Sequence, residues 1–170
     1  MTDPDIQPIQ DDSDVPTAEL LDLFRAAFGG ADTLCPANQR WIARLDGLVV
    51  SHVAVQRRWF LVNRVYHEGW FVGMVCTGPD QQHKGLATQL VLRAHEDLGR
   101  EDLAFTALNC GDGGVPFYEQ LGYTCISPRG TYLRGDRGIV DEDPAMAFSL
   151  NPDFDVQDLA CDSFPFGFDF

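Results

Sequence analysis

A turn between a strand and a helix has residues suited to holding an anion. It is the stretch Val75-Cys76-Thr77, followed after a short connection by Gln82-His83-Lys84-Gly85-Leu86-Ala87. The first backbone N–H groups of a helix have no partner inside the helix, and the helix dipole favours negative charge there. Gly85 allows a close approach to the backbone, and Ala87 keeps the surface low. The stretch therefore predicts a cradle that a pyrophosphate group would fit.

This stretch lacks the signatures of two common nucleotide-binding turns. A dinucleotide-binding turn requires G-x-G-x-x-G and a phosphate-binding loop requires G-x-x-x-x-G-K-[ST], and neither is present. By itself the stretch is equally compatible with an ordinary tight turn. A second feature lies further along the chain, where Phe117-Tyr118-Glu119-Gln120-Leu121-Gly122-Tyr123 places a tyrosine in a predicted short helix.

Hydrophobic periodicity predicts the elements that position these residues. A helix is expected over residues 17–28, capped by Thr17 or Asp14 and ended by Gly29-Gly30. Asp46-Gly47 is typical of a two-residue hairpin turn. The expected strands are 6–9, 41–45, 48–55, 59–66, 70–77, 103–108, 123–126 and 145–150, and the further helices are 86–98 and 115–121. The strand 48–55 either ends there or continues through Gln56-Arg57-Arg58 into the run 59–66.

The order of these elements predicts the fold class. One helix precedes several antiparallel strands, and alternating strands and helices follow. This order is typical of an α/β protein with a mixed, mostly antiparallel central sheet and helices on both faces. Residues 127–143 are polar and rich in glycine, and the tail after Asn151 is expected to be irregular. The length of 170 residues fits one domain.

The charge of the chain is concentrated at its two ends. The net charge is −14; residues 1–22 hold seven acidic residues and residues 138–170 hold eight, and neither segment has a Lys or Arg. Nucleic acid is not an expected partner, because phosphate binding requires a basic patch. A cationic ligand is favoured. The alternative is that the acidity serves solubility or adaptation to high salt.

Membrane insertion and metal binding are not expected. No apolar run approaches the ~20 residues of a membrane span, and the acidic N-terminus does not resemble a targeting signal, so we expect a cytoplasmic protein. The five cysteines form no C-x-x-C pair, which favours neither a zinc site nor a disulfide framework. They are expected to be small buried hydrophobic residues.

The two features together resemble the GNAT superfamily of acyltransferases. The resemblance rests on Pro79 with Gln82-x-x-Gly85-x-Ala87, and on Tyr118-x-x-x-Gly122-Tyr123 at the family's spacing. It implies that acetyl-CoA is the co-substrate. The backbone of Val75, Cys76 and Thr77 would bind the pantetheine arm and polarise the thioester carbonyl. The amides of residues 82–87 would bind the pyrophosphate, and Tyr118 would protonate the departing thiolate.

The resemblance leaves the general base open. Many members of the superfamily have a glutamate on the strand before the turn, and the matching position here is about Val72, which cannot accept a proton. The candidates are then Glu68, His67 and His52, directly or through water.

A closer likeness is to the aminoglycoside 2′-N-acetyltransferases. It rests on the stretch Ser51–Arg58, on an acidic turn at Asp141-Glu142-Asp143 before a final strand, and on the aromatic, acidic C-terminus. It implies that a polyamine sugar is held by Asp32, Asn109, Asp141, Glu142, Asp143 and the Asp169-Phe170 terminus. The nodulation N-acyltransferases, which use longer acyl donors, share a similar framework. Other small primary amines, and peptide amines, also remain candidate acceptors.

A rival function is a non-catalytic acyl-CoA-binding module. Such a module would still bind acyl-CoA in the cradle but would not catalyse transfer. The absence of a glutamate general base at Val72 is consistent with this function. The expected organisation is an acidic leader over residues 1–14, the acyltransferase domain over 15–150 and a packed tail over 151–170. Dimers are common among similar proteins, so a homodimer is possible here. The aromatic tail Phe164–Phe168 is expected to cover an apolar patch on the same or a partner subunit, or else to cap the acceptor cleft.

Overall fold

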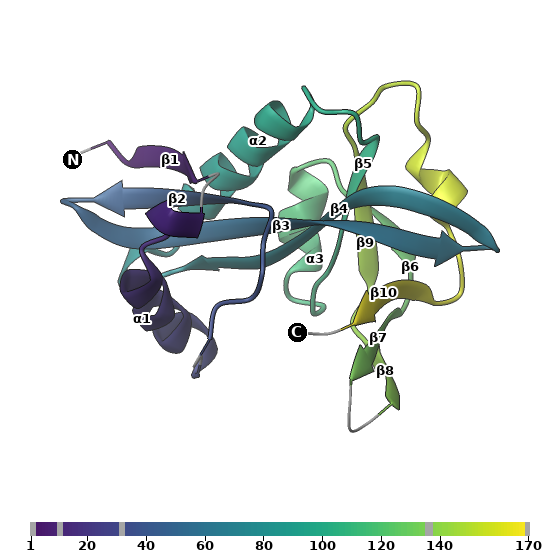
Figure 1. Cartoon of the computed structure of the whole chain (residues 1–170), viewed down its shortest axis with the longest axis horizontal. Helices are drawn as coiled ribbons and strands as arrows, with labels where there is room; N and C mark the ends of the chain where they lie inside the picture. Colours follow the sequence, from purple (N-terminus) through teal and green to yellow (C-terminus); the bar gives the residue numbers. More distant parts are fainter. Residues whose placement is uncertain (1–2, 10–11, 31–32, 135–137, 169–170) are drawn as a thin grey trace. The chain divides into compact units, whose positions relative to one another are not determined.

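A computed structural model describes residues 3–9, 12–30, 33–134 and 138–168. Its main sheet has seven strands in the order β1-β2-β3-β4-β5-β9-β6, and a second sheet has the order β10-β7-β8 (Figure 1). The fold is α/β, as the sequence predicts. The chain divides into two compact units, Met1–Gln56 with Val72–Asp97, and Arg57–Phe71 with Leu98–Phe170. None of the described helices is long and apolar enough to cross a membrane.

The first unit is built on antiparallel strands. It contains β1 (Asp5–Ile9), β2 (Gln39–Leu45), the beginning of β3 (Leu48–Val62) and the end of β4 (Val65–Thr77). Asp46 and Gly47 both have positive φ, at 51° and 84°, which confirms the predicted two-residue hairpin between β2 and β3. The register places Trp41 opposite Val53 and Ile42 opposite His52.

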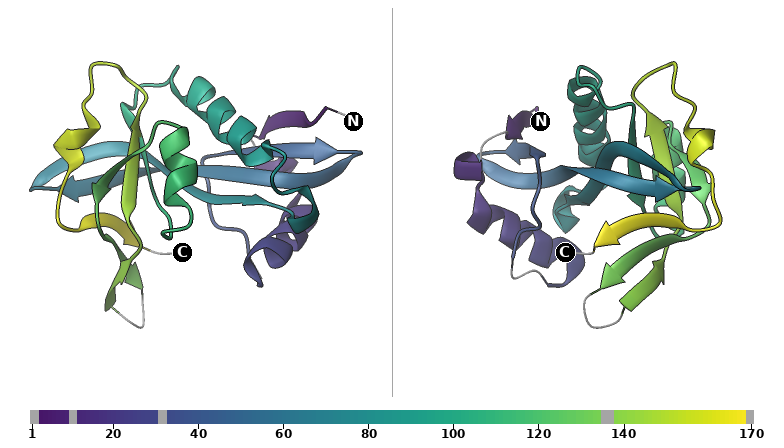
Figure 2. Two further views of the ribbon diagram at one scale, coloured as in Figure 1. Left: turned by 180° about the vertical axis from the view of Figure 1, so that it is seen from behind. Right: turned by 45° about the vertical axis from the view of Figure 1, so that its right-hand side comes forward.

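Helices cover both faces of these strands. Ile42 packs with Leu20 and Phe24 of α1 (Thr17–Phe28), whereas its neighbour Trp41 donates from Nε1 to Asp97 Oδ2 of α2 (Leu86–Leu98) at 2.9 Å. Because successive strand residues point to opposite faces, the two helices lie on opposite sides of the strands, as Figure 2 also shows.

The ends of α1 agree only in part with the sequence. Gly29, at φ 79°, ends the helix and donates to Arg25 O, as expected. The predicted cap by Thr17 or Asp14 is wrong. Pro16 occupies the capping position without a side-chain bond, and Asp14 belongs to a preceding 3-10 helix, η1 (Asp12–Asp14).

The second unit begins with the hairpin that ends β3 and starts β4. Asn63 and Arg64 have φ of 50° and 67°, so they form a two-residue turn in the left-handed region. The prediction of one strand over residues 59–66 is therefore wrong: this apolar run contains the end of β3, the turn and the beginning of β4. The turn was not predicted because the residues on both sides of it are apolar and were read as one strand.

Three short strands and one helix follow. The strand β5 (Phe105–Asn109) pairs antiparallel with β9 (Ala145–Ser149), which pairs antiparallel with β6 (Thr124–Ser127). A short helix, α3 (Val115–Gln120), connects β5 to β6. The ladder between β4 and β5 is parallel and comprises two pairs, Trp70 with Thr106 and Phe71 with Ala107.

The C-terminal third of the chain is more regular than predicted. The polar segment contains β7 (Gly130–Arg134) and β8 (Gly138–Glu142), and the tail contains a 3-10 helix, η3 (Val156–Leu159), and a strand, β10 (Phe164–Phe168). The expectation of an irregular tail is wrong, because β10 pairs in parallel with β7.

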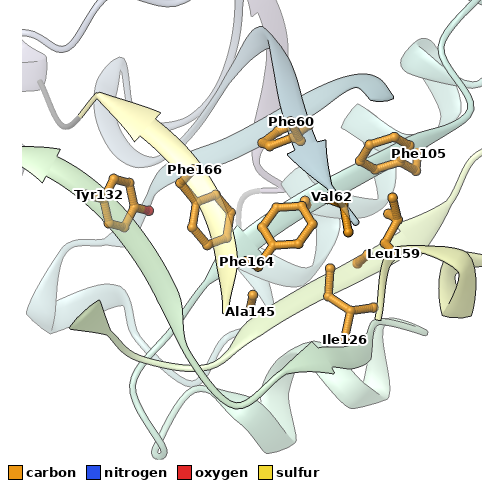
Figure 3. Packing of buried hydrophobic residues seen from close by; sticks show 11 residues of the cluster. Phe60, Val62, Phe105, Ile126, Tyr132, Ala145, Leu159, Phe164 and Phe166 are labelled. Atoms are coloured by element: carbon orange, nitrogen blue, oxygen red, sulfur yellow. The ribbon is translucent and has the colours of Figure 1, made fainter. Parts of the chain in front are cut away.

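The tail supplies the core of the second unit. Phe164 and Phe166 are 0% and 1% exposed, and their rings lie 5.2 and 6.3 Å from the ring of Phe60 (Figure 3). Tyr132 of β7 stacks on Phe166 at 5.1 Å. The aromatic tail therefore covers an apolar surface within its own unit, one of the alternatives that the sequence left open.

Candidate functional site

The carboxyl end of β4 is bound tightly to β3. The buried Ser51 Oγ donates to Cys76 O at 2.8 Å and accepts from Thr77 Oγ1 at 2.8 Å. Gly78 N donates to Val50 O at 2.9 Å. Ser51 and His52 are the two polar residues in the otherwise apolar beginning of β3, Leu48–Val55, and a polar residue in such a run is a sequence signal for a contact of this kind. Together these bonds fix the backbone of the predicted pantetheine-binding residues.

An irregularity in β4 precedes this end. Met74 has φ of 53°, which is unusual for a strand residue and needs support from its surroundings. His52 supplies that support, because its Nδ1 donates to Met74 O at 2.8 Å. Arg40 Nη1 donates to His52 Nε2 at 3.2 Å, so both ring nitrogens are engaged. No sequence pattern marked Met74.

His52 is consequently a positioning residue. Burial lowers the pKa of its imidazole to about 3, against the hydrogen bond to Met74, and the charge of Arg40 lowers it further. The ring is therefore neutral at physiological pH, with its proton on Nδ1. Its two hydrogen bonds leave no nitrogen for an incoming amine, which removes it from the candidate bases.

One edge of the β4 end has no strand partner among the described residues. The ladder to β5 stops at Phe71, and among the described residues Val72–Thr77 have a strand neighbour only on the β3 side. Cys76 is buried, which raises the pKa of its thiol to about 12 and keeps it protonated. A ligand at this segment would therefore bind to its backbone groups and not to the thiol.

The predicted cradle follows directly. After a 3-10 turn, η2 (Pro79–Gln81), His83 and Gly85 adopt positive φ of 62° and 76°. The first backbone bond of α2 runs from Gln89 N to Gly85 O at 3.0 Å. Within the described chain, the amides of residues 83–88 have no backbone acceptor. Successive free amides at a helix N-terminus form an anion-binding concavity.

Side chains brace the cradle and leave its surface open. Gln82 Nε2 donates to Thr77 O at 3.3 Å, and Lys84 Nζ donates to Asp80 O at 3.2 Å and to Gln81 Oε1 at 2.8 Å. Leu86 is 4% exposed and anchors the helix start. A Cβ atom on Gly85 would meet nothing within 4 Å, so a phosphate has room there.

Tyr118 lies in the aromatic cluster of the second unit. Its ring is 4.9 Å from that of Phe117 and 5.4 Å from that of Tyr123. Burial, followed by the neighbouring Cys110, raises the pKa of Tyr118, so the phenol keeps its proton. Tyr123 differs because its hydroxyl accepts from Thr106 Oγ1 at 3.0 Å, whereas no hydrogen bond to the Tyr118 hydroxyl occurs among the described residues.

Two of the predicted acceptor contacts lie near the end of β5. Asn109 Oδ1 accepts from Tyr132 Oη at 2.5 Å, which orients the amide. Asp143 is exposed, and a Cβ atom on Gly111 would lie 3.6 Å from its Oδ2. Asn109 pairs with Ala145 in the β5–β9 ladder, which explains why residues distant in sequence meet here.

The other predicted acceptor contacts are changed or lie outside the description. Asp141 and Glu142 end the strand β8, opposite Thr131 and Gly130, and are not part of a turn. The strand after Asp143 is also not the last, because β10 follows. The prediction of an acidic turn before a final strand is thus wrong. Asp32, Asp169 and Phe170 lie outside the described residues.

The remaining candidate bases differ in their surroundings. Glu68 accepts from Arg57 Nε at 2.6 Å and from Arg57 Nη2 at 3.0 Å, and this pairing lowers the pKa of Glu68. His67 is half-buried, with no hydrogen bond to its ring among the described residues.

The cysteines are less buried than predicted. Cys76 alone is buried, Cys125 is exposed and the others are half-buried; all five are free thiols. Among the described residues, no group of three His, Cys, Asp or Glu side chains is arranged to hold a metal ion.

Comparison with known proteins identifies the family. The family model of the acetyltransferase (GNAT) family matches residues 7–123. The chain therefore belongs to the acetyltransferase (GNAT) family, which confirms the superfamily, the fold and the acyltransferase class predicted from the two motifs. A search of curated proteins found no significant match.

Solved structures share the fold at low sequence identity. The ribosomal-protein-S18-alanine N-acetyltransferase of Escherichia coli is 15% identical, with a TM-score of 0.65 over 89% of this chain and 97% of that one. An aminoglycoside 6′-N-acetyltransferase complexed with coenzyme A is 16% identical, with a TM-score of 0.65 over 88% and 99%. YhbS of Escherichia coli in complex with CoA is 16% identical, with a TM-score of 0.67 over 97% and 92%.

Some similar structures are much longer. A probable N-acyltransferase from Enterococcus faecalis V583 is 20% identical, with a TM-score of 0.62 over 74% of this chain. This chain spans only 33% of that protein's length.

Proposed function

We propose that this protein transfers an acetyl group from acetyl-CoA to a primary amine of a small, cationic molecule. The observation that carries the proposal is the series of free amides over residues 83–88, directly after a strand end whose outer edge is also free. Two structures with the same fold hold coenzyme A, which is consistent with this co-substrate.

Different groups of the chain would bind the co-substrate, polarise the thioester and supply a proton. The thioester supplies an activated acyl group; the amine nitrogen forms a bond to its carbonyl carbon, and the carbon–sulfur bond breaks. The amides of residues 83–88 would hold the pyrophosphate, and backbone groups of Val75–Thr77 would bind the pantetheine arm and polarise the carbonyl. Tyr118 would give its proton to the departing thiolate.

The amine must lose a proton before it attacks. His52 is engaged by Met74 and Arg40, and Glu68 by Arg57, so solvent or His67 is left to accept that proton. Orientation of the free amine beside the thioester would then supply much of the rate. The rate should accordingly rise with pH as the acceptor's own ammonium group ionises.

An amino sugar or aminoglycoside is the acceptor that the residues favour. Asp143 is exposed near the oriented amide of Asn109, and the chain carries a net charge of −14. Each ammonium group of such a sugar gains from pairing with a carboxylate. The resemblance to the aminoglycoside 2′-N-acetyltransferases supports the 2′ amino group of such a sugar as the acetylated position.

A thiol-release assay tests the proposal. The intact protein is incubated with acetyl-CoA and a panel of aminoglycosides, amino sugars, monoamines and short peptides, while acetyl-CoA binding is measured separately by calorimetry. Thiol release with amino sugars is the expected result, and mass spectrometry of the product then gives the acetylated nitrogen. Binding of acetyl-CoA without release for any amine would overturn acetyl transfer, and would favour a longer acyl donor or a binding module.

A further inference from the structure

Two neighbouring side chains of β3 hold the carbonyl groups on either side of Val75. His52 Nδ1 donates to Met74 O and Ser51 Oγ donates to Cys76 O, both at 2.8 Å. The carbonyl of Met74 and the N–H of Val75 belong to one planar trans peptide unit and point in opposite directions. The bond from His52 therefore fixes the direction of the Val75 N–H, one of the backbone groups proposed to polarise the thioester.

The imidazole of His52 can make this bond in only one of its two neutral forms. A neutral imidazole carries its proton on Nδ1 or on Nε2, and only the first form can donate to Met74 O. In the second form two lone pairs would face each other across 2.8 Å. The ring is 0% exposed and lies edge-on to Phe24 at 4.9 Å, so solvent does not replace the lost bond. The tautomer of His52 thus decides whether the Met74 carbonyl is held.

Arg40 determines which tautomer is present. A guanidinium has N–H donors and no acceptor, so Arg40 Nη1, at 3.2 Å from His52 Nε2, requires a lone pair on that nitrogen. The proton of the neutral ring is then on Nδ1, where it meets Met74 O. Burial lowers the pKa of His52 to about 3, so the ring stays neutral and this choice persists throughout the physiological pH range.

The loop over residues 33–38 holds Arg40 in position. Arg40 is 4% exposed, and its Nη2 donates to Cys35 O. The loop is itself bonded to β3, because Asn38 N donates to Val55 O at 2.9 Å. The planar guanidinium is therefore fixed through two of its nitrogens, and it keeps its orientation towards the imidazole.

We infer that Arg40 is a positioning residue for acyl transfer: it selects the tautomer of His52, and the imidazole then aims the Val75 N–H so that it can polarise the thioester carbonyl. This inference rests on the proposed function, in which backbone groups of residues 75–77 act on that carbonyl. A hydrogen bond weakens steeply when its donor is misdirected. Loss of the tautomer should lower the rate of transfer more than the affinity for acyl-CoA, whose pyrophosphate is assigned to the separate amides of residues 83–88.

Proton–nitrogen NMR correlation spectra of the labelled full chain report the tautomer of each histidine without any need for catalysis. In the wild type His52 should carry its proton on Nδ1, and His52→Asn identifies its signals. Arg40→Met should populate the form protonated on Nε2, whereas Arg40→Lys should retain the Nδ1 form, because an ammonium group also has donors only. Arg40→Gln, whose amide can also accept, replaces Arg40→Met if circular dichroism shows that the latter does not fold.

Steady-state kinetics then test the effect on transfer. Arg40→Met should lower kcat about tenfold or more and change acetyl-CoA affinity, measured by calorimetry, less than about threefold, and Arg40→Lys should restore most of kcat. His52→Asn places an amide donor near the position of Nδ1 with no tautomer to select, so adding Arg40→Met to it should cost little further. Arg44→Met is the matched control on the same strand, because it breaks an ion pair with Glu19 at 2.8 Å and should leave the tautomer and kcat unchanged.

Three outcomes would overturn the inference. The first is a proton that stays on Nδ1 in Arg40→Met, the second is a changed tautomer with an unchanged kcat, and the third is an Arg40→Lys variant as impaired as Arg40→Met. A wild type that releases no thiol with any amine would overturn the proposed function, and with it the role in transfer. The spectra would still show in that case whether Arg40 selects the tautomer of His52.

Discussion

The cradle at residues 75–87 and the C-terminal segment at residues 127–168 contribute to the molecule in opposite ways. The cradle is contiguous in sequence, and its backbone amides are available to bind a ligand. The C-terminal segment is built from strands that pair with one another and from aromatic rings that are hidden from solvent. The comparison teaches that local backbone chemistry can be recognised from a motif, whereas packing depends on partners elsewhere in the chain.

The difference has a physical origin in each region. In the cradle, positive φ at His83 and Gly85 and the unpaired amides of a helix start depend on neighbouring residues only. In the C-terminal segment, Phe166 is buried because Phe60, Phe71 and Tyr132 surround it. Four predictions would break or sharpen this contrast.

The largest effect is expected in the aromatic core. Phe166→Ala should lower the free energy of unfolding by about 3–5 kcal/mol, because it removes a fully buried ring and leaves a cavity. Urea denaturation followed by circular dichroism measures this. Phe28→Ala is the control, since Phe28 is 52% exposed and should cost far less. A similar loss in both variants would show that the tail is no more than a surface strand.

Substitutions in the cradle should change the affinity for acetyl-CoA more than the stability of the fold. Gly85→Glu should weaken acetyl-CoA binding by about 100-fold or more, because it adds bulk and negative charge where a phosphate would lie. Calorimetry measures the affinity. Gly85→Ala separates the strain of positive φ from the charge and should cost less. Gly30→Glu places the same charge on open surface in the first unit, and undiminished binding by Gly85→Glu would contradict the site.

Tyr118 tests whether a buried aromatic residue also has a chemical role. Tyr118→Phe should lower kcat about 100-fold and leave acyl-CoA affinity unchanged, because the ring still packs but the proton is lost. Steady-state kinetics and calorimetry measure the two quantities. Tyr123→Phe, in the same cluster, loses the bond from Thr106 and should affect stability more than kcat. Equal kcat values in Tyr118→Phe and wild type would make Tyr118 a packing residue.

The smallest expected effect is a dependence of stability on pH. Burial lowers the pKa of His52 to about 3 and that of His95 to about 4, below their unfolded value of 6.5. The unfolded chain therefore binds more protons below pH 6.5, and stability falls as the pH drops from there towards these folded values. Each histidine should cost roughly 1 kcal/mol between pH 7.5 and 5.5. Urea midpoints at the two pH values measure this, and His52→Gln should remove roughly half of the difference, because His95 still contributes. An unchanged difference would contradict the burial of His52.

Much of the fold could be predicted because its signals were local. The Asp46-Gly47 turn, the helix end at Gly29 and the helix over residues 86–98 all follow from residue types at fixed spacing. The turn at Asn63-Arg64 was missed, since apolar residues on both sides read as one strand. The strands β7, β8 and β10 were missed because glycine and charge weaken the alternation that marks a strand.

The candidate site also has a part that the sequence predicted and a part that it did not. The motif predicted the cradle, but the support of Met74 by His52 and Arg40 joins three parts of the chain and could not be read from any one of them. The proposed role of His52 changed for this reason. Its residue type suggested a base, and only its burial and its two partners make it a positioning residue.

The sequence by itself determined most helices and strands before residue 127, the two motifs and hence the acetyltransferase (GNAT) family, because these depend on spacing along the chain. The tertiary structure alone decided that the aromatic tail joins the core of its unit, and that Trp59, Leu61 and Tyr66 of the β3–β4 hairpin stay exposed. Burial is a property of what surrounds a side chain, and those surroundings come from residues far away in the sequence.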